Sequence, residues 1–154
     1  MKLIPILAIA VLSLPCAAQT ASKAEVFSGD DLAKQFAPLM QSAKASGSSG
    51  ATLGDYNSHA IKLSVRTSSG GAEVHAHYDD VFVVTDGKAT LITGGTVANA
   101  KTGSDGETKG SSVQGGKSQT LTKGDVVHIP AGMPHQLIIA PGDVYSSIVV
   151  KVKE

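Results

Sequence analysis

The chain has 154 residues, which is enough for one domain but too few for two independent cores of ordinary size. Its 13 basic and 13 acidic residues balance and form no basic block, which argues against nucleic-acid binding because phosphate contacts supply most of that affinity. With 42% hydrophobic residues, 17 glycines and a single cysteine, the composition favours a small β-rich domain and excludes an intrachain disulfide framework.

The first residues have the layout of a secretory signal peptide. Lys2 gives a positive start, an apolar run covers positions 3–14, and the small residues Ala17 and Ala18 follow. This apolar run is shorter than the roughly 20 residues that a membrane-spanning helix needs. We therefore expect residues 1–18 to be removed, which gives an exported protein, periplasmic or secreted, with no stable membrane anchor and no thiol.

Residues 19–54 are expected to contain one helix and a flexible joint. Ser28 can cap the helix, with Asp31 three residues later as its partner. Pro38 lies inside the helical pattern and is expected to kink or shorten the helix. The serine- and glycine-rich stretch 44–50 predicts a flexible joint. One face of the predicted helix is apolar and would pack on the outside of a β domain or against a dimer partner; its residues are Leu32, Phe36, Leu39 and Met40.

Residues 55–154 show short apolar runs with a period of two, bounded by glycine and aspartate. Asp86-Gly87 is typical of a hairpin turn between two such runs. The polar segment Gly94–Gly116 is expected to be a mobile loop or, alternatively, a functional flap. This pattern predicts an all-β sandwich or antiparallel barrel. The predicted strands are Ala60–Arg66, Glu73–His77, Val81–Thr85, Ala89–Thr93, Ser118–Leu121, Asp125–Ile129, Gln136–Ile139 and Ser146–Val152.

Four of the five histidines fall in two short segments. In the first segment, His75 and His77 are two residues apart, so their side chains would share one face of a strand. Asp80 follows after a short turn and can return a carboxylate toward them. In the second segment, His135 comes directly after a corner rich in proline and glycine. Imidazoles and a carboxylate that meet on one inner face suit a divalent transition metal.

The second segment resembles a signature motif of the cupin superfamily. Gly124, Pro130, Gly132 and His135 have the spacing of that motif throughout. Ile139 stands where the motif often ends in asparagine.

The first segment resembles the other cupin motif, in which an H-x-H pair is followed by a glutamate and then a glycine. His75 and His77 form the pair, Asp80 stands in place of the glutamate, and Gly87 follows at the family spacing. Only two residues separate His77 from Asp80, one fewer than the usual minimum, which leaves Asp79 as an alternative carboxylate.

The resemblance covers residues 55–153 and implies a cupin jelly-roll, an antiparallel β-barrel, which would follow the short N-terminal helix predicted above. It implies one divalent transition metal, either manganese, iron, nickel or zinc. The implied ligands are His75, His77, Asp80 and His135. Similar cupins are often homodimers in which an N-terminal segment crosses to the partner.

Four protein ligands would leave about two positions of an octahedral ion open for water or substrate. We therefore expect a metal-dependent enzyme that acts on a small oxygenated molecule, of dioxygenase, isomerase, decarboxylase or lyase type. His128 and Tyr78 are candidates for a general acid or base. In other roles, His128 would orient a metal ligand by a hydrogen bond and Tyr78 would belong to the barrel wall.

Two other functions are open besides the enzyme. One is a non-catalytic barrel that binds a sugar or another small molecule, and the other is a barrel whose metal site has degenerated. Arg66, the single arginine, could anchor a carboxylate or lie on a solvated face.

Overall fold

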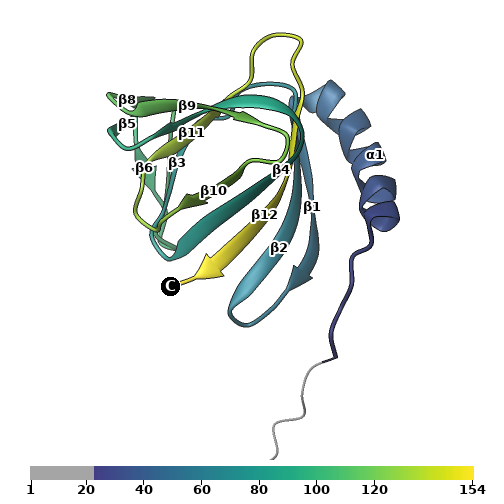
Figure 1. Cartoon of the computed structure of the whole chain (residues 1–154). Coiled ribbons are helices and arrows are strands. Elements are labelled where there is room, and N and C mark those ends of the chain that lie inside the picture. Colours follow the sequence, from purple (N-terminus) through teal and green to yellow (C-terminus); the bar gives the residue numbers. More distant parts are fainter. Residues whose placement is uncertain (1–22) are drawn as a thin grey trace, which may run out of the picture.

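A computed structural model describes residues 23–154, so the expected signal peptide lies outside the described residues. Within them, helix α1 (Gly29–Ser46) precedes a β-barrel (Figure 1). No helix in this part of the chain is long and apolar enough to span a membrane. The strands are β1 (Ser48–Asp55), β2 (His59–Arg66), β3 (Ala72–His75), β4 (Tyr78–Thr93), β5 (Thr96–Ala98), β6 (Lys101–Thr102), β7 (Glu107–Gly110), β8 (Ser112–Gln114), β9 (Lys117–Thr122), β10 (Val126–Ile129), β11 (His135–Ile138) and β12 (Tyr145–Lys153).

Strand β4 belongs to both walls of the barrel. Its first half pairs with β12 and β10, and its second half pairs with β11 and β9, all antiparallel. The change of partner lies at Gly87, which has a φ of 74°, and a Cβ at this position would overlap the carbonyl oxygen of Val144. The hairpin predicted at Asp86-Gly87 is therefore wrong. The glycine instead lets one continuous strand turn the corner of the barrel.

The two walls enclose an apolar core. One wall has the order β1-β2-β12-β4-β10, and the other continues from β4 through β11, β3, β7 and β6. The predicted all-β antiparallel barrel with an N-terminal helix is confirmed. The buried side chains of the core are Phe82, Val84, Ala89, Leu91, Leu121, Ile129, Leu137, Ile139 and Tyr145.

Helix α1 packs on the outside of the barrel against β1 and β2 (Figure 1). The Ser28 hydroxyl caps it by accepting a hydrogen bond from the Asp31 amide at 3.2 Å, as the sequence predicts. The helix continues through Pro38 to Ser46, so the predicted shortening does not occur. It ends at Gly47, which has the left-handed conformation that glycine adopts without strain.

Two polar segments are strands where the sequence predicts irregular structure. The expected joint at 44–50 is wrong, because the helix and β1 leave only Gly47 between them, and β1 pairs with β2 along its length. Gly94–Gly116 is not a loop without regular structure, because β5 to β8 lie within it and β7 pairs with β3. In both segments backbone pairing with a neighbouring strand overrides the local composition.

Candidate metal centre

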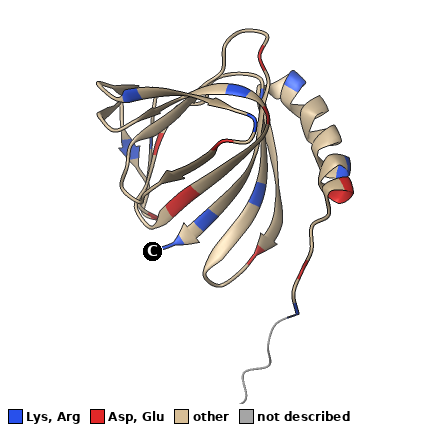
Figure 2. Ribbon diagram, in the orientation of Figure 1, with Lys and Arg blue, Asp and Glu red and all other residues tan. Residues whose placement is uncertain are grey.

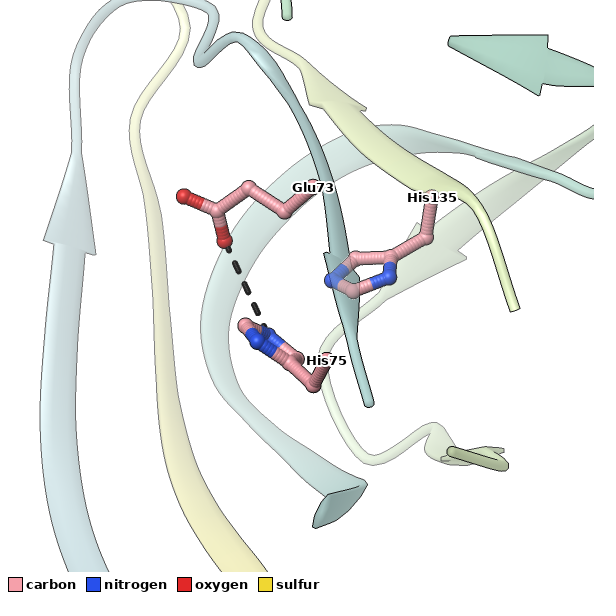
Figure 3. A group of neighbouring side chains, drawn as sticks. All are labelled: Glu73, His75 and His135. Carbon is pink, nitrogen blue, oxygen red and sulfur yellow. Dashed lines mark ion pairs between the residues drawn. The ribbon is translucent and has the colours of Figure 1, made fainter. Parts of the chain in front are cut away.

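Strands β3 and β11 bring two histidines and a glutamate together inside the barrel (Figure 3). Glu73 and His75 are two residues apart on β3, so they share one face of that strand. His135 is the first residue of β11 and lies opposite Glu73 in the β3–β11 pairing. One nitrogen or oxygen atom of each of these three side chains lies within 4.8 Å of the others. The pairing register of β3 and β11 therefore builds the group.

Asp80 joins this group from β4. Its Oδ2 atom lies 3.2 Å from Nε2 of His75 and 3.8 Å from Nε2 of His135. Its Oδ1 atom accepts a hydrogen bond at 2.7 Å from Nζ of Lys151, the residue opposite it on β12. In Figure 2 an acidic stretch of β4 lies beside a basic stretch of β12, as the pairing of the two strands requires. Asp80 is only 3% exposed, so its charge is buried but paired, and one oxygen still faces both imidazoles.

The Nδ1 atom of each histidine in the group is held by an acceptor. The Glu107 carboxylate of β7 accepts a hydrogen bond from His75, and the carbonyl oxygen of Met133 accepts one from His135 at 3.1 Å. These bonds assign a proton to each Nδ1. Nε2 of neutral His135 is therefore free to bind a metal, whereas Nε2 of His75 binds one once the proton that it donates to Asp80 is lost. Carboxylate and carbonyl partners of this kind orient metal-ligating histidines. The donor set therefore fits a divalent transition metal.

Burial and hydrogen bonding act in opposite directions on the protonation of the group. Burial works to lower the pKa of His75, yet hydrogen bonds to Asp80 and Glu107 raise it above its ordinary value. Burial works to raise the pKa of Asp80, but hydrogen bonds from His75 and Lys151 hold it below its usual range. Burial lowers the pKa of His135. Asp80 is therefore ionised at neutral pH, His135 is neutral, and His75 favours its protonated form more than an ordinary histidine does.

Three of the four predicted ligands come together, and His77 does not. Strand β3 ends at His75, the following residues form a bend, and His77 is exposed at the barrel mouth. The prediction that His77 shares the inner face with His75 is wrong, because the alternation of a strand does not continue through a bend. Glu73, two residues before His75, occupies that face instead. The same alternation applied toward the N-terminus would have found it.

The two candidate acid–base residues lie outside the group. Nε2 of His128 lies 2.8 Å from Oδ2 of Asp79, and the other Asp79 oxygen accepts a hydrogen bond from the Ala131 amide at 2.7 Å. The His128 side chain is 58% exposed and lies outside the centre. Asp79 directly precedes Asp80 on β4, so the alternative carboxylate lies on the opposite face of the strand. Tyr78 lies at the mouth, where Nζ of Lys151 is 5.8 Å from the centre of its ring. Sequence reasoning missed Lys151, although it shares a strand face with buried residues of β12.

A cavity of about 300 Å³ adjoins the centre. All four side chains of the group line it, and Lys62 and Arg66 of β2 line it from the wall that also carries Asp80. A more open cavity of about 780 Å³ lies at the mouth and shares Lys62 and Lys151 with the inner one. The inner cavity has the size at which small-molecule sites begin.

The sequence matches no protein-family model and no curated protein. The cupin domain of Cnp3 from Schizosaccharomyces pombe has a similar structure, with a TM-score of 0.52 at 11% identity over 70% of this chain and 65% of that one. The polyketide cyclase RemF from Streptomyces resistomycificus has a TM-score of 0.51 at 16% identity, over 70% of this chain and 66% of that one. The DMSP lyase DddQ from Ruegeria pomeroyi DSS-3 has a TM-score of 0.51 at 15% identity, over 70% of this chain and 47% of that one.

The chain matches less than two thirds of the length of each of these proteins. At such low identity the likeness concerns the fold, and fold alone does not fix activity. The chain therefore has the cupin fold.

Proposed function

We propose that the protein is an exported, metal-dependent enzyme that acts on a small oxygenated molecule inside the barrel. The observation that supports this is the convergence of His75, His135, Glu73 and Asp80 on one cavity. Two imidazoles with carboxylates form a donor set for manganese, iron, nickel or zinc. Such an ion, when bound, supplies Lewis-acid polarisation of a substrate oxygen.

Other side chains of the barrel prepare this group for ligation. Glu107 and the carbonyl of Met133 accept hydrogen bonds from the Nδ1 atoms of His75 and His135. The Nε2 atoms are then the ones that would bind a metal. Lys151 balances the buried charge of Asp80 and lies where the inner cavity meets the mouth. Its ammonium group is therefore placed to donate a hydrogen bond to an anionic oxygen of a bound molecule. Tyr78, beside Lys151 at the mouth, remains the candidate for a proton-transfer role.

The first test is elemental analysis of the exported protein, purified without chelator or added metal, followed by titration of the chelated protein with each ion. We expect near-stoichiometric binding of one transition metal. His75→Ala and His135→Ala should each abolish tight binding, and Glu73→Gln should weaken it. His59→Ala and His77→Ala are matched controls, because both rings lie at the mouth outside the group. Equal metal retention in all five variants would contradict the proposed centre.

Export is tested separately by the mass of the protein recovered outside the cytoplasm. We expect a chain that begins at Gln19, after removal of residues 1–18. Recovery of the full-length chain from the cytoplasmic fraction alone would refute the export part of the proposal, and the metal titration would be unaffected.

One observation favours a second candidate function, a non-catalytic barrel that binds a small molecule without metal. The Lys151 ammonium already lies 2.7 Å from Asp80, and carboxylates on both sides of His75 favour its protonated form. These contacts form a charge network that is balanced without an ion. In that case the chelated protein would take up no ion from any titration and would still bind its ligand.

A further inference from the structure

The inner cavity carries two cationic side chains that form no ion pair with an acidic residue of the described chain. Lys62 and Arg66 both lie on β2 and line the cavity, and neither takes part in an ion pair within residues 23–154. Lys151, the third cation, is paired with Asp80. Glu73 is the remaining acidic residue of the lining and lies 3.8 Å from His75. The lining therefore has an excess of positive charge before any metal is bound, which favours an anionic occupant.

Arg66 lies against a glycine that makes room for its guanidinium. A Cβ atom on Gly70 would lie 2.6 Å from Nη1 and 3.2 Å from Cζ of Arg66. Gly70 does not have a positive φ, so what matters at this position is the absence of a side chain. Gly70 also lines the cavity. A guanidinium offers parallel N–H donors whose spacing matches the two oxygens of a carboxylate.

Lys62 adds to the positive charge around Arg66. The two residues are four apart on β2, so they share the face of that strand that lines the cavity. Ser147 of β12 also lines the cavity, but its Oγ and the hydroxyl of Tyr145 are both buried within the protein and are not offered to a bound molecule. The groups of this wall that can meet an anion and form no ion pair within the described residues are therefore the side chains of Lys62 and Arg66.

We infer that the cavity binds a small carboxylate-bearing molecule. Its carboxylate pairs with the guanidinium of Arg66, and the rest of the molecule extends toward His75 and His135. This last contact rests on the proposed function, whereas the contact with Arg66 does not. The same guanidinium fork also matches two oxygens of a phosphate group, so inorganic phosphate is the competing anion that the test must exclude.

The test is calorimetric titration of the full exported protein with malonate, succinate and glutarate, once with chelated and once with metal-loaded protein. Inorganic phosphate and succinamide, the neutral diamide of succinate, are the competing probes. We expect a dicarboxylate to bind, and Arg66→Met to weaken that binding by about tenfold or more. Arg66→Lys should recover part of the affinity, because it keeps the charge without the fork of donors. Lys117→Met, which removes an exposed cation of β9 outside the cavity, should bind like the wild type.

One further variant separates a lost contact from a lost fold. Gly70→Ala should displace the guanidinium and weaken binding, with little change in melting temperature because Gly70 does not have a positive φ. Equal binding by the wild type and Arg66→Met, or equal binding of succinamide or phosphate, would overturn the inference. A protein that takes up no metal but binds a dicarboxylate through Arg66 would refute the metal centre alone. A protein that takes up metal but binds no dicarboxylate would refute the carboxylate site alone.

Discussion

The carboxylate of Glu107 gives the sharpest test of how the centre is organised. It reaches Nδ1 of His75 from β7, inside a segment that the sequence predicts to be a loop. Glu107→Gln keeps the size of the side chain and an acceptor oxygen but removes the negative charge. Glu107→Ala leaves Nδ1 without this acceptor. Both variants therefore change the orientation and basicity of His75 without altering an atom that would touch a metal.

The size of the effect follows from the burial of this contact. Loss of a partner that orients a ligating histidine costs about 10- to 100-fold in metal affinity, which is roughly 1.4 to 2.8 kcal/mol. The Glu107 side chain is 25% exposed, so water can partly replace its oxygen. We therefore expect Glu107→Gln near the lower end of this range and Glu107→Ala near the middle.

The assay is competition between the chelated protein and a chromophoric chelator for zinc at neutral pH. Asp86→Asn is the control, because that carboxylate is 74% exposed and its ion pair with Lys123 spans 3.9 Å. In a His75→Ala background the Glu107 substitutions should have no further effect, because they act through that ring. Additive losses in the double variants, or wild-type affinity in Glu107→Ala, would refute the orienting role.

Three further predictions concern stability, each measured by urea unfolding of the chelated protein. Because the folded-state pKa of His75 is raised, its stabilising contribution is complete below about pH 6.5 and is lost as the pH rises through the raised pKa. The cost of His75→Gln should therefore shrink as the pH increases, and a cost that grows would contradict the assigned contacts. Gly87→Ala should destabilise by more than about 2 kcal/mol, since a φ of 74° is strained for alanine and the new methyl overlaps the Val144 carbonyl. Leu91→Ala, at a residue 1% exposed, should cost about 2–5 kcal/mol, and a smaller loss would mean a loosely packed core.

The strands that the sequence predicts well are those in which apolar and polar residues alternate. Strands β2, β9, β10, β11 and β12 each differ from the predicted range by a residue or two at an end. Strand β1 and the short strands within Gly94–Gly116 carry no such pattern, because backbone pairing holds them without a continuous apolar face. The aspartate and glycine at 86–87 fit a hairpin and a bulge equally well. The difference depends on which strands pair with β4 on either side, and that information lies far away in the sequence.

For the centre, the sequence predicts the residues that a local motif can carry. His75, Asp80 and His135 are brought together as the two motifs imply. Glu107 and Lys151 were missed because only strand register connects them to the centre, through the pairs β3–β7 and β4–β12. No local pattern marks either residue as part of a site, and the glycine-rich surroundings of Glu107 point to a loop instead.

The exchange of His77 for Glu73 has a direct cause in the shortened motif. Strand β3 ends at His75 and β4 begins at Tyr78, so Ala76 and His77 are the only residues left to reverse the chain. His77 therefore lies in the bend and is exposed, and it does not continue the face of β3 that carries His75. The carboxylate of Glu73 then occupies the place on the inner face, and the donor set changes from three imidazoles and one carboxylate to two of each. Because carboxylates favour harder ions, this exchange shifts the expected preference from nickel and zinc toward manganese and iron(II), and the titration with each ion measures that preference directly.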